Sequence, residues 1–145
     1  MNGSRQGRGA ASAYRAVEGI GAEPEDFMKM ALDAARLQLL RAETAIDAHQ
    51  RVEKTQALSS AGSIVEFMLG LSGSAPGSLS ECLVSVYQYV LAAILKGNAG
   101  DDTETVGAAR VALEELAAAW RSIFPDTIGW EESSDSALSG RRDYA

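Results

Sequence analysis

The chain has 145 residues and a mass of 15.3 kDa, enough for one domain with a single hydrophobic core. Its formal net charge of −7, from 20 acidic and 13 basic residues, argues against nucleic-acid binding, which depends on clustered lysine and arginine. The single cysteine, Cys82, excludes an internal disulfide and a multi-cysteine zinc site. The single histidine, His49, excludes chemistry that needs two imidazoles from one chain.

The two ends of the chain differ in composition from its middle. Residues 1–15 hold glycine, serine, alanine and three arginines without the apolar run of a secretory signal, so residues 1–23 are predicted to be a flexible arm. The polar residues 125–145 are predicted to be a disordered tail. No run approaches the ~18 uninterrupted apolar residues of a membrane helix, and an unpaired cysteine is typical of a reducing compartment. These features predict a soluble protein without membrane insertion.

The central region, residues 24–124, has the apolar period of helices. It predicts four helices, over about 24–49, 51–71, 78–96 and 102–124, with residues 97–100 as the loop before the last. Ser78 with Glu81, and Asp101 with Glu104, have the spacing of a capping box. Because short loops make neighbouring helices antiparallel, the expected fold is all-α, an up-down-up-down four-helix bundle.

No combination of residues in the sequence is typical of an enzyme, a metal site or a cofactor site. The acids Asp101, Asp102 and Glu104 are interpreted as the start of a helix, where negative charge is favourable. Cys82 is interpreted as a small, partly buried apolar residue. A histidine phosphotransfer domain using His49 is kept as an alternative, although the residues after His49 lack that family's pattern and the predicted helix ends there.

The helices carry more apolar residues than a small bundle needs. The first predicted helix has two apolar stripes, and the third adds Val84, Tyr87 and Leu91 outside its main stripe. A bundle helix needs about one such stripe, so the surplus predicts a surface that binds a partner helix.

The order of residues from Tyr14 to Ile123 resembles the flagellar secretion chaperone family, FliS. The most specific similarities are Tyr87-Gln88-Tyr89 in the third helix, Asn98 with Asp101 after it, and Ala119-Trp120-Arg121 in the fourth. Weaker similarities are Tyr14, Pro24, Phe27, Met30, Asp33, Ala42, Ala45, Ile46, Ala61, Ile64 and Val65. The chain departs from the family pattern at Glu23, at residues 31–34, at Gln88 and at residues 92–93, which identifies it as a divergent member.

The resemblance implies a cytoplasmic export chaperone that binds the C-terminal segment of flagellin and prevents its polymerisation before type III flagellar secretion. That segment, here called the client, would fold as helices along an apolar groove of the bundle. The residues predicted to form the groove are Phe27, Met28, Leu32, Tyr87, Tyr89 and Leu91. In the arm, Tyr14, Val17 and Ile20 are predicted to fold over this groove when no client is bound.

The sequence allows more than one partner and more than one oligomeric state. An export-gate component is a second potential partner, and the protein could be a monomer or a homodimer. A generic helical adaptor or secretion partner unrelated to flagella is the main alternative function, because it would also bind a helix in a groove.

Overall fold

The structure, a computed structural model, describes residues 23–73, 75 and 77–125. The described residues form four helices and no strand: α2 (Pro24–Asp47), α3 (Arg51–Ser72), α4 (Gly77–Gly100) and α5 (Thr103–Ile123). Most of the predicted arm, with Tyr14, Val17 and Ile20, and nearly all of the predicted tail lie outside the described residues.

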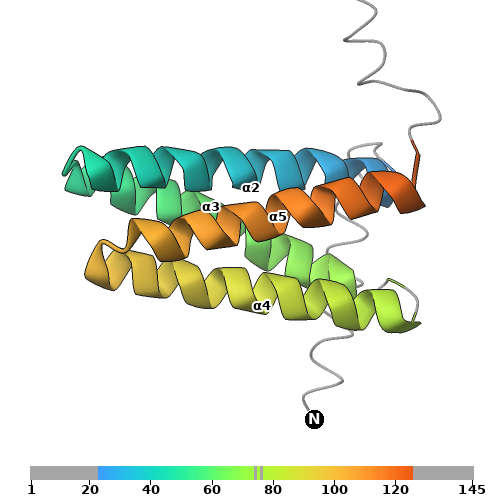
Figure 1. The fold of residues 1–145 in the computed structure, drawn as a ribbon. Coiled ribbons are helices and arrows are strands. Elements are labelled where there is room, and N and C mark those ends of the chain that lie inside the picture. Colours follow the sequence, from blue (N-terminus) through green and yellow to red (C-terminus); the bar gives the residue numbers. More distant parts are fainter. Residues whose placement is uncertain (1–22, 74, 76, 126–145) are drawn as a thin grey trace, which may run out of the picture.

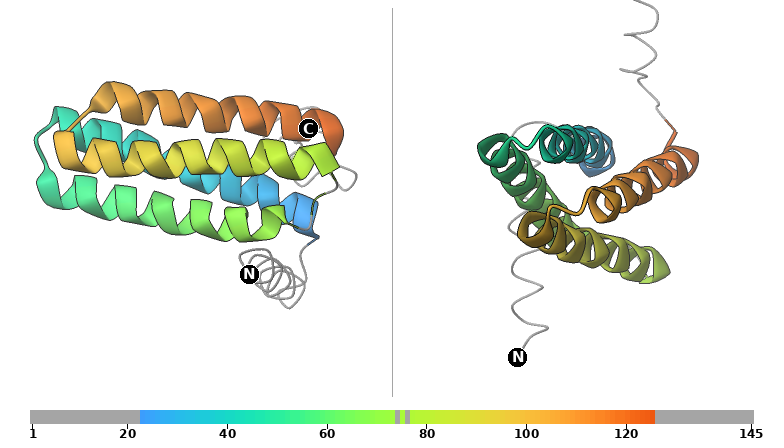
Figure 2. Two further views of the ribbon diagram at one scale, coloured as in Figure 1. Left: turned by 90° about the horizontal axis from the view of Figure 1, so that it is seen from below. Right: turned by 60° about the vertical axis from the view of Figure 1, so that its left-hand side comes forward.

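The four helices form the predicted antiparallel bundle. Each runs opposite to the one before it, and the start of α2 and the end of α5 lie at the same end of the molecule (Figures 1 and 2). Helix α2 packs against α3 and α5, and α4 packs against the same two helices, whereas α2 and α4 are diagonal neighbours. This ring of contacts around a shared interior confirms the all-α four-helix bundle.

One continuous core fills the space between the helices. Two long side chains reach far across it: the Tyr87 hydroxyl of α4 donates to the Met28 sulfur of α2 at 3.0 Å, and the Trp120 indole N–H of α5 donates to the Glu25 carbonyl oxygen at 3.0 Å. Trp120 is buried in this core. Burial raises the pKa of the Tyr87 hydroxyl, which therefore stays neutral.

The turn between α4 and α5 differs from the sequence prediction. Residues 97–100, predicted as a loop, continue α4 to Gly100. Asp102, and not Asp101, is the N-cap of α5, because its carboxylate accepts the Thr105 N–H at 3.1 Å. Ser78 is the second residue of α4 and so does not precede that helix as a cap.

Gly97 allows α4 to continue into this turn against α5. A Cβ atom at residue 97 would overlap the Val106 side chain of α5, which is itself fully buried. At Gly62 of α3, by contrast, a Cβ atom would meet nothing within 4 Å. The two glycines therefore differ: Gly97 permits a close contact between α4 and α5, whereas Gly62 leaves open space beside α3.

We predict opposite effects on stability when each glycine is changed to alanine. Gly97→Ala should lower the free energy of unfolding by about 1–3 kcal/mol, because the added methyl group overpacks the α4–α5 contact. Gly62→Ala should raise it by up to ~1 kcal/mol, because alanine favours the helix and the added group has room. Urea denaturation of both variants tests this, and equal effects would contradict it.

Two polar contacts tie helices that are distant in sequence. The buried ammonium of Lys54, near the start of α3, donates to the Asn98 carbonyl oxygen at 3.0 Å and binds the Asp101 carboxylate. The Asp101 backbone adopts a φ of 50° in this turn. Arg110 of α5 binds both carboxylate oxygens of Glu43 on α2, one of them at 3.2 Å through Nη2. The first contact joins α3 to the turn between α4 and α5, and the second joins α5 to α2.

The contact between Lys54 and Asp101 makes stability depend on pH. The hydrogen bond from Lys54 lowers the pKa of the Asp101 carboxyl below its ordinary value of 3.8. The ionised Asp101 carboxylate therefore stabilises the fold fully above pH 3.8, its ordinary pKa in the unfolded chain. This stabilisation is lost as the pH falls through the lower pKa that Asp101 has in the folded state. Asp101→Asn should lower the free energy of unfolding at pH 7, and its difference from the wild type should shrink in acid.

Urea titrations at a series of pH values measure this difference. Glu115→Gln, which removes a charge from an exposed position on α5, is the matched control and should show no such pH-dependent difference. If the difference in free energy of unfolding between Asp101→Asn and the wild type stayed constant in acid, the contact of Asp101 with Lys54 would not be the source of the pH dependence.

Candidate binding surface

Three of the six predicted groove residues lie in the core. Met28, Leu32 and Tyr87 are only 4%, 1% and 0% exposed. The prediction that they line a surface groove is therefore wrong for this structure. The reason is geometric, because the tyrosine side chain spans the bundle axis and ends on the Met28 sulfur instead of at the surface.

The other three residues lie in separate hollows between different helix pairs. Phe27 lines a hollow between α2 and α3. Leu91 lines one between α3 and α4, and Tyr89 lines one between α4 and α5. The six residues therefore do not form the single groove that the sequence predicted.

The hollow of Phe27 is almost entirely apolar and has a volume of about 410 Å³. The rings of Phe27 and Phe67 pack with their centroids 5.6 Å apart, and Met30 beside them is 55% exposed. Ala31, Ala34, Ser63 and Ile64 complete its lining. An apolar hollow with exposed large side chains is suited to the nonpolar face of another helix.

The hollow of Leu91 lies on the other side of α3 and has a volume of about 580 Å³. It has apolar walls from Leu58, Leu91 and Ile94, and Leu95, at its edge, is 73% exposed. Its remaining lining is Thr55, Ser59, Gly62, Ser63, Glu66 and Asn98.

The two hollows meet on α3. Ser63 lines both of them, and its neighbour Gly62 has open space where a side chain would stand. We call this surface the α3 saddle, formed by Phe27, Met30, Gly62, Ser63, Ile64, Phe67, Leu91 and Leu95. Because Gly62 and Ser63 have small side chains where the two hollows meet, one partner segment could lie across α3 there and contact both hollows.

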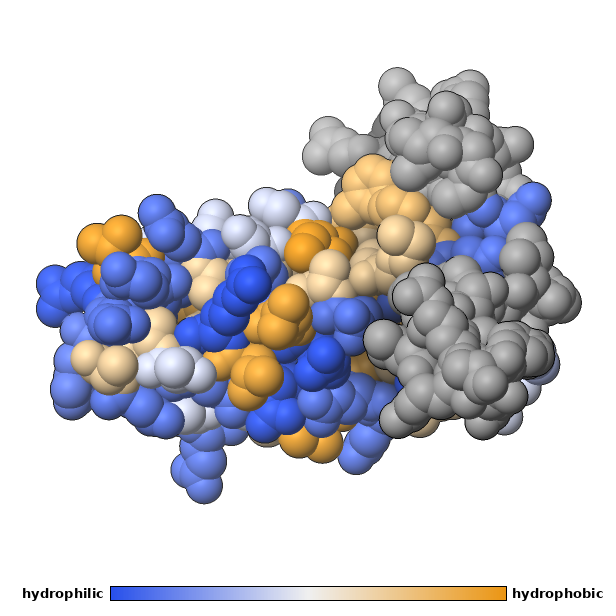
Figure 3. Space-filling view, turned by 90° about the horizontal axis from the view of Figure 1, so that it is seen from above, coloured by the Kyte–Doolittle hydropathy of each residue, from blue (hydrophilic) through white to orange (hydrophobic). Residues whose placement is uncertain are grey.

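Phe67 of α3 and Leu95 of α4, two exposed members of the saddle, were not among the groove residues predicted from the sequence. Both are large apolar residues outside the stripe that their helix buries, and this is the signal that could have found them. The face of the bundle seen in Figure 3 shows apolar side chains in separate patches among hydrophilic ones.

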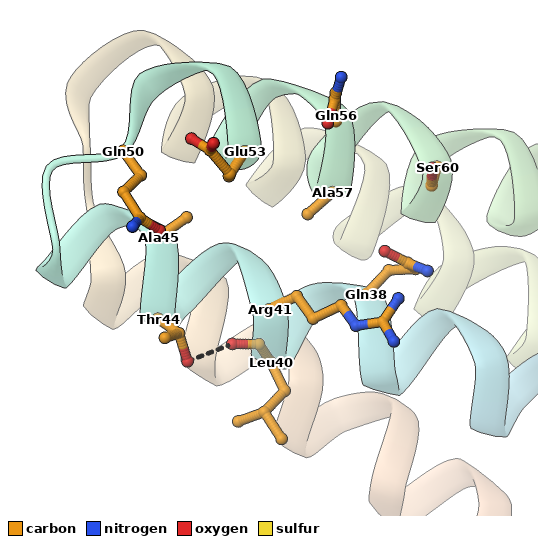
Figure 4. A pocket seen from close by; sticks show the side chains of 10 residues that line it. All are labelled: Gln38, Leu40, Arg41, Thr44, Ala45, Gln50, Glu53, Gln56, Ala57 and Ser60. Carbon is orange, nitrogen blue, oxygen red and sulfur yellow. Dashed lines mark hydrogen bonds between the residues drawn. The ribbon is translucent and has the colours of Figure 1, made fainter.

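A fourth hollow, between α2 and α3 near the turn that joins them, is lined mostly by polar residues. Arg41, Glu53 and the amides of Gln38, Gln50 and Gln56 surround it, and its volume is about 590 Å³. Residues of both helices face this space, and Thr44 donates to the Leu40 carbonyl oxygen at 3.2 Å (Figure 4). Within the described part of the chain, no three histidine, cysteine or acidic side chains are grouped as a metal site would require.

Two sequence interpretations of single residues have different outcomes. Cys82 is exposed, so its interpretation as a partly buried residue is wrong. It lies on the side of α4 that faces away from the core residues Leu83 and Tyr87. His49 lies in the turn after α2, with a φ of 56°, which agrees with a helix-end histidine.

Helix α4 is long and apolar enough, by length and composition, to span a membrane. Glu81 and Lys96 are its only charged residues. In this structure α4 packs against α3 and α5 through a buried face that includes Leu83, Tyr87 and Val90. Apolar helices that line a bundle core meet the same criterion.

Comparison with known proteins identifies the family. The model of the family described as "Flagellar protein FliS" matches residues 7–127. The chain belongs to the FliS family. It is also 29% identical over 108 residues to the flagellar secretion chaperone FliS of Salmonella typhimurium, a match that covers 73% of this chain and 80% of that protein. The resemblance seen in the sequence is thereby confirmed, and the chain is a member of a flagellar secretion chaperone family.

The structure explains why the FliS-like residues of α4 and α5 have different surroundings. Tyr87 and Trp120 are both buried. Tyr87 donates a hydrogen bond to Met28 of α2, and Trp120 donates one to Glu25 in the first turn of α2. Tyr89, two residues from Tyr87, points to the opposite side of α4 and is 49% exposed. The motif Tyr87-Gln88-Tyr89 thus combines one core residue with one surface residue.

Proposed function

We propose that this protein is a cytoplasmic export chaperone that binds the C-terminal helical segment of flagellin and keeps it from polymerising before type III flagellar secretion. Two observations support the proposal: membership of the FliS family and the apolar α3 saddle. The name of the Salmonella relative, a flagellar secretion chaperone, also supports a role in flagellar export. On this proposal the protein has no catalytic activity.

The observation that carries the proposal is that the apolar hollow of Phe27 and the partly apolar hollow of Leu91 meet at Gly62 and Ser63. A helix that is disordered when free needs an apolar surface on which to fold, and each hollow supplies part of one. The missing side chain at Gly62 lets a helix backbone pass close to α3 between the two hollows. Coupled folding of this kind typically buries ~1,000–3,000 Å² and loses several kcal/mol to ordering, which keeps binding reversible.

The arm is proposed to cover part of this saddle when no client is bound. Tyr14, Val17 and Ile20 precede Pro24, the first residue of α2. Phe27 is in the first turn of α2, so the arm joins the bundle beside the apolar hollow that Phe27 lines. A client that fills this hollow would displace the arm. A component of the export gate stays a predicted second partner.

A binding experiment tests the proposed function directly. Full-length protein is mixed with a peptide of the flagellin C-terminal segment, and far-UV circular dichroism follows helix content. We expect more helix in the mixture than in the sum of the two components, because the peptide folds as it binds. Strictly additive spectra, together with no heat of binding in calorimetry, would contradict the proposal and favour a helical adaptor unrelated to flagella.

A pair of variants on α3 tests the site. Gly62→Glu should weaken binding of the flagellin peptide at least tenfold, because it places a charged side chain between the apolar hollows. It should leave the bundle folded, because the position has open space around it. Ser60→Glu adds the same group to the same helix at the polar hollow, and it should bind like the wild type. Equal affinities for all three proteins would show that the client binds elsewhere.

A further inference from the structure

The two hollows of the α3 saddle are lined by uncharged side chains with one exception. Glu66 of α3 lines the hollow of Leu91, and no other charged residue lines either hollow. Its side chain is exposed. Glu66 follows Gly62 and Ser63 by one helical turn and therefore lies on the same side of α3 as the place where the two hollows meet.

The charge of Glu66 has no partner in the part of the chain that the structure describes. No hydrogen bond or ion pair there involves it. The acids Glu43 and Glu114, by contrast, both bind Arg110. The positions on α3 from which a base could reach Glu66, three and four residues away on each side, hold the uncharged residues Gly62, Ser63, Leu69 and Gly70.

Helix α4, which packs beside α3, does not supply a base either. Its only basic residue is Lys96. Because Lys54, near the start of α3, contacts the Asn98 carbonyl oxygen, Lys96 lies close to the start of α3. That level is about 15 Å from Glu66 along the helix. The saddle therefore has one uncompensated negative charge among uncharged side chains.

A partner that covers Glu66 must compensate this charge. A carboxylate that loses its water without gaining a base or a donor is costly, so a segment lying over Glu66 binds well only when it supplies one. Lysine and arginine suit this position, because their aliphatic stems pack on apolar walls while their charged ends reach an acid. Leu58, Leu91 and Ile94 provide such walls in this hollow.

We propose that Glu66 is a specificity-determining residue of the saddle and that the segment bound there carries a lysine or arginine that pairs with it. The base lies within one helical turn of the client residue that contacts Gly62, since Glu66 is one turn from Gly62. This inference rests on the proposed function, because the client is the segment that the saddle binds. A client with an acid at the same position would meet a like charge and bind poorly.

A double-mutant cycle tests the pairing. Calorimetry measures binding of full-length protein to a peptide of the flagellin C-terminal segment, and to peptides in which each lysine or arginine is replaced singly by glutamine. Glu66→Gln should weaken binding of the unchanged peptide about fivefold. For one of the substituted peptides, the wild type should lose the same factor, whereas Glu66→Gln should lose nothing further.

Charge reversal and salt give two further readouts. Glu66→Lys should bind a peptide with glutamate in place of that base more tightly than it binds the unchanged peptide. Raising the salt concentration should reduce the difference in affinity between the wild type and Glu66→Gln, because salt screens a pair at the edge of an interface.

Glu53→Gln is the matched control. It removes the same charge from the same helix, at an exposed residue that lines the polar hollow, and it should bind the peptide like the wild type. Far-UV circular dichroism of the free proteins should be the same for both variants and the wild type, because both glutamates are exposed.

Three results would overturn the role of Glu66 while the proposed function stands. These are a Glu66→Gln variant that binds the flagellin peptide as tightly as the wild type, a cycle without coupling to any base of the peptide, or a Glu53→Gln control that weakens binding equally. If the peptide does not bind the wild type at all, the proposed function and this inference fail together.

Discussion

A four-helix bundle can bury only the side of each helix that faces the axis, and this chain has more apolar side chains than those four sides can hold. The core takes Leu39, Val65, Val90 and Leu113, one from each helix, together with their neighbours along the same stripes. Met30, Phe67, Tyr89 and Leu95 are left at the surface. The exposure of these residues is the physical basis of every binding surface described above.

The exposed apolar residues lie on all four described helices. The edge between α2 and α5 is closed by the ion pair of Arg110 with Glu43 and by the hydrogen bond of Trp120 to the first turn of α2. On α3 and α4, the exposed side chains of Phe67, Tyr89 and Leu95 line the hollows described above. In α4 the reason is composition, because only Glu81 and Lys96 are charged in 24 residues.

In the proposed function, these surfaces would bind a client that folds only on binding. A rigid core held by long side chains across the axis keeps the hollows in place before the client arrives, which lowers the cost of binding. The open space at Gly62 would give the backbone of such a client access to α3.

The sequence by itself determined the fold class, the four helices and the family, because helix period, prolines and the Tyr87 and Trp120 motifs are local patterns. It also indicated that apolar residues would be left over. The sequence could not show which apolar residues would be exposed. Tyr87 and Tyr89 are the same residue type two positions apart, and Tyr87 is buried while Tyr89 is exposed only because they point to opposite sides of α4. The tertiary structure decided that Met28 and Leu32 belong to the core and that two hollows meet at Ser63, because both depend on how α2, α3 and α4 are packed against one another.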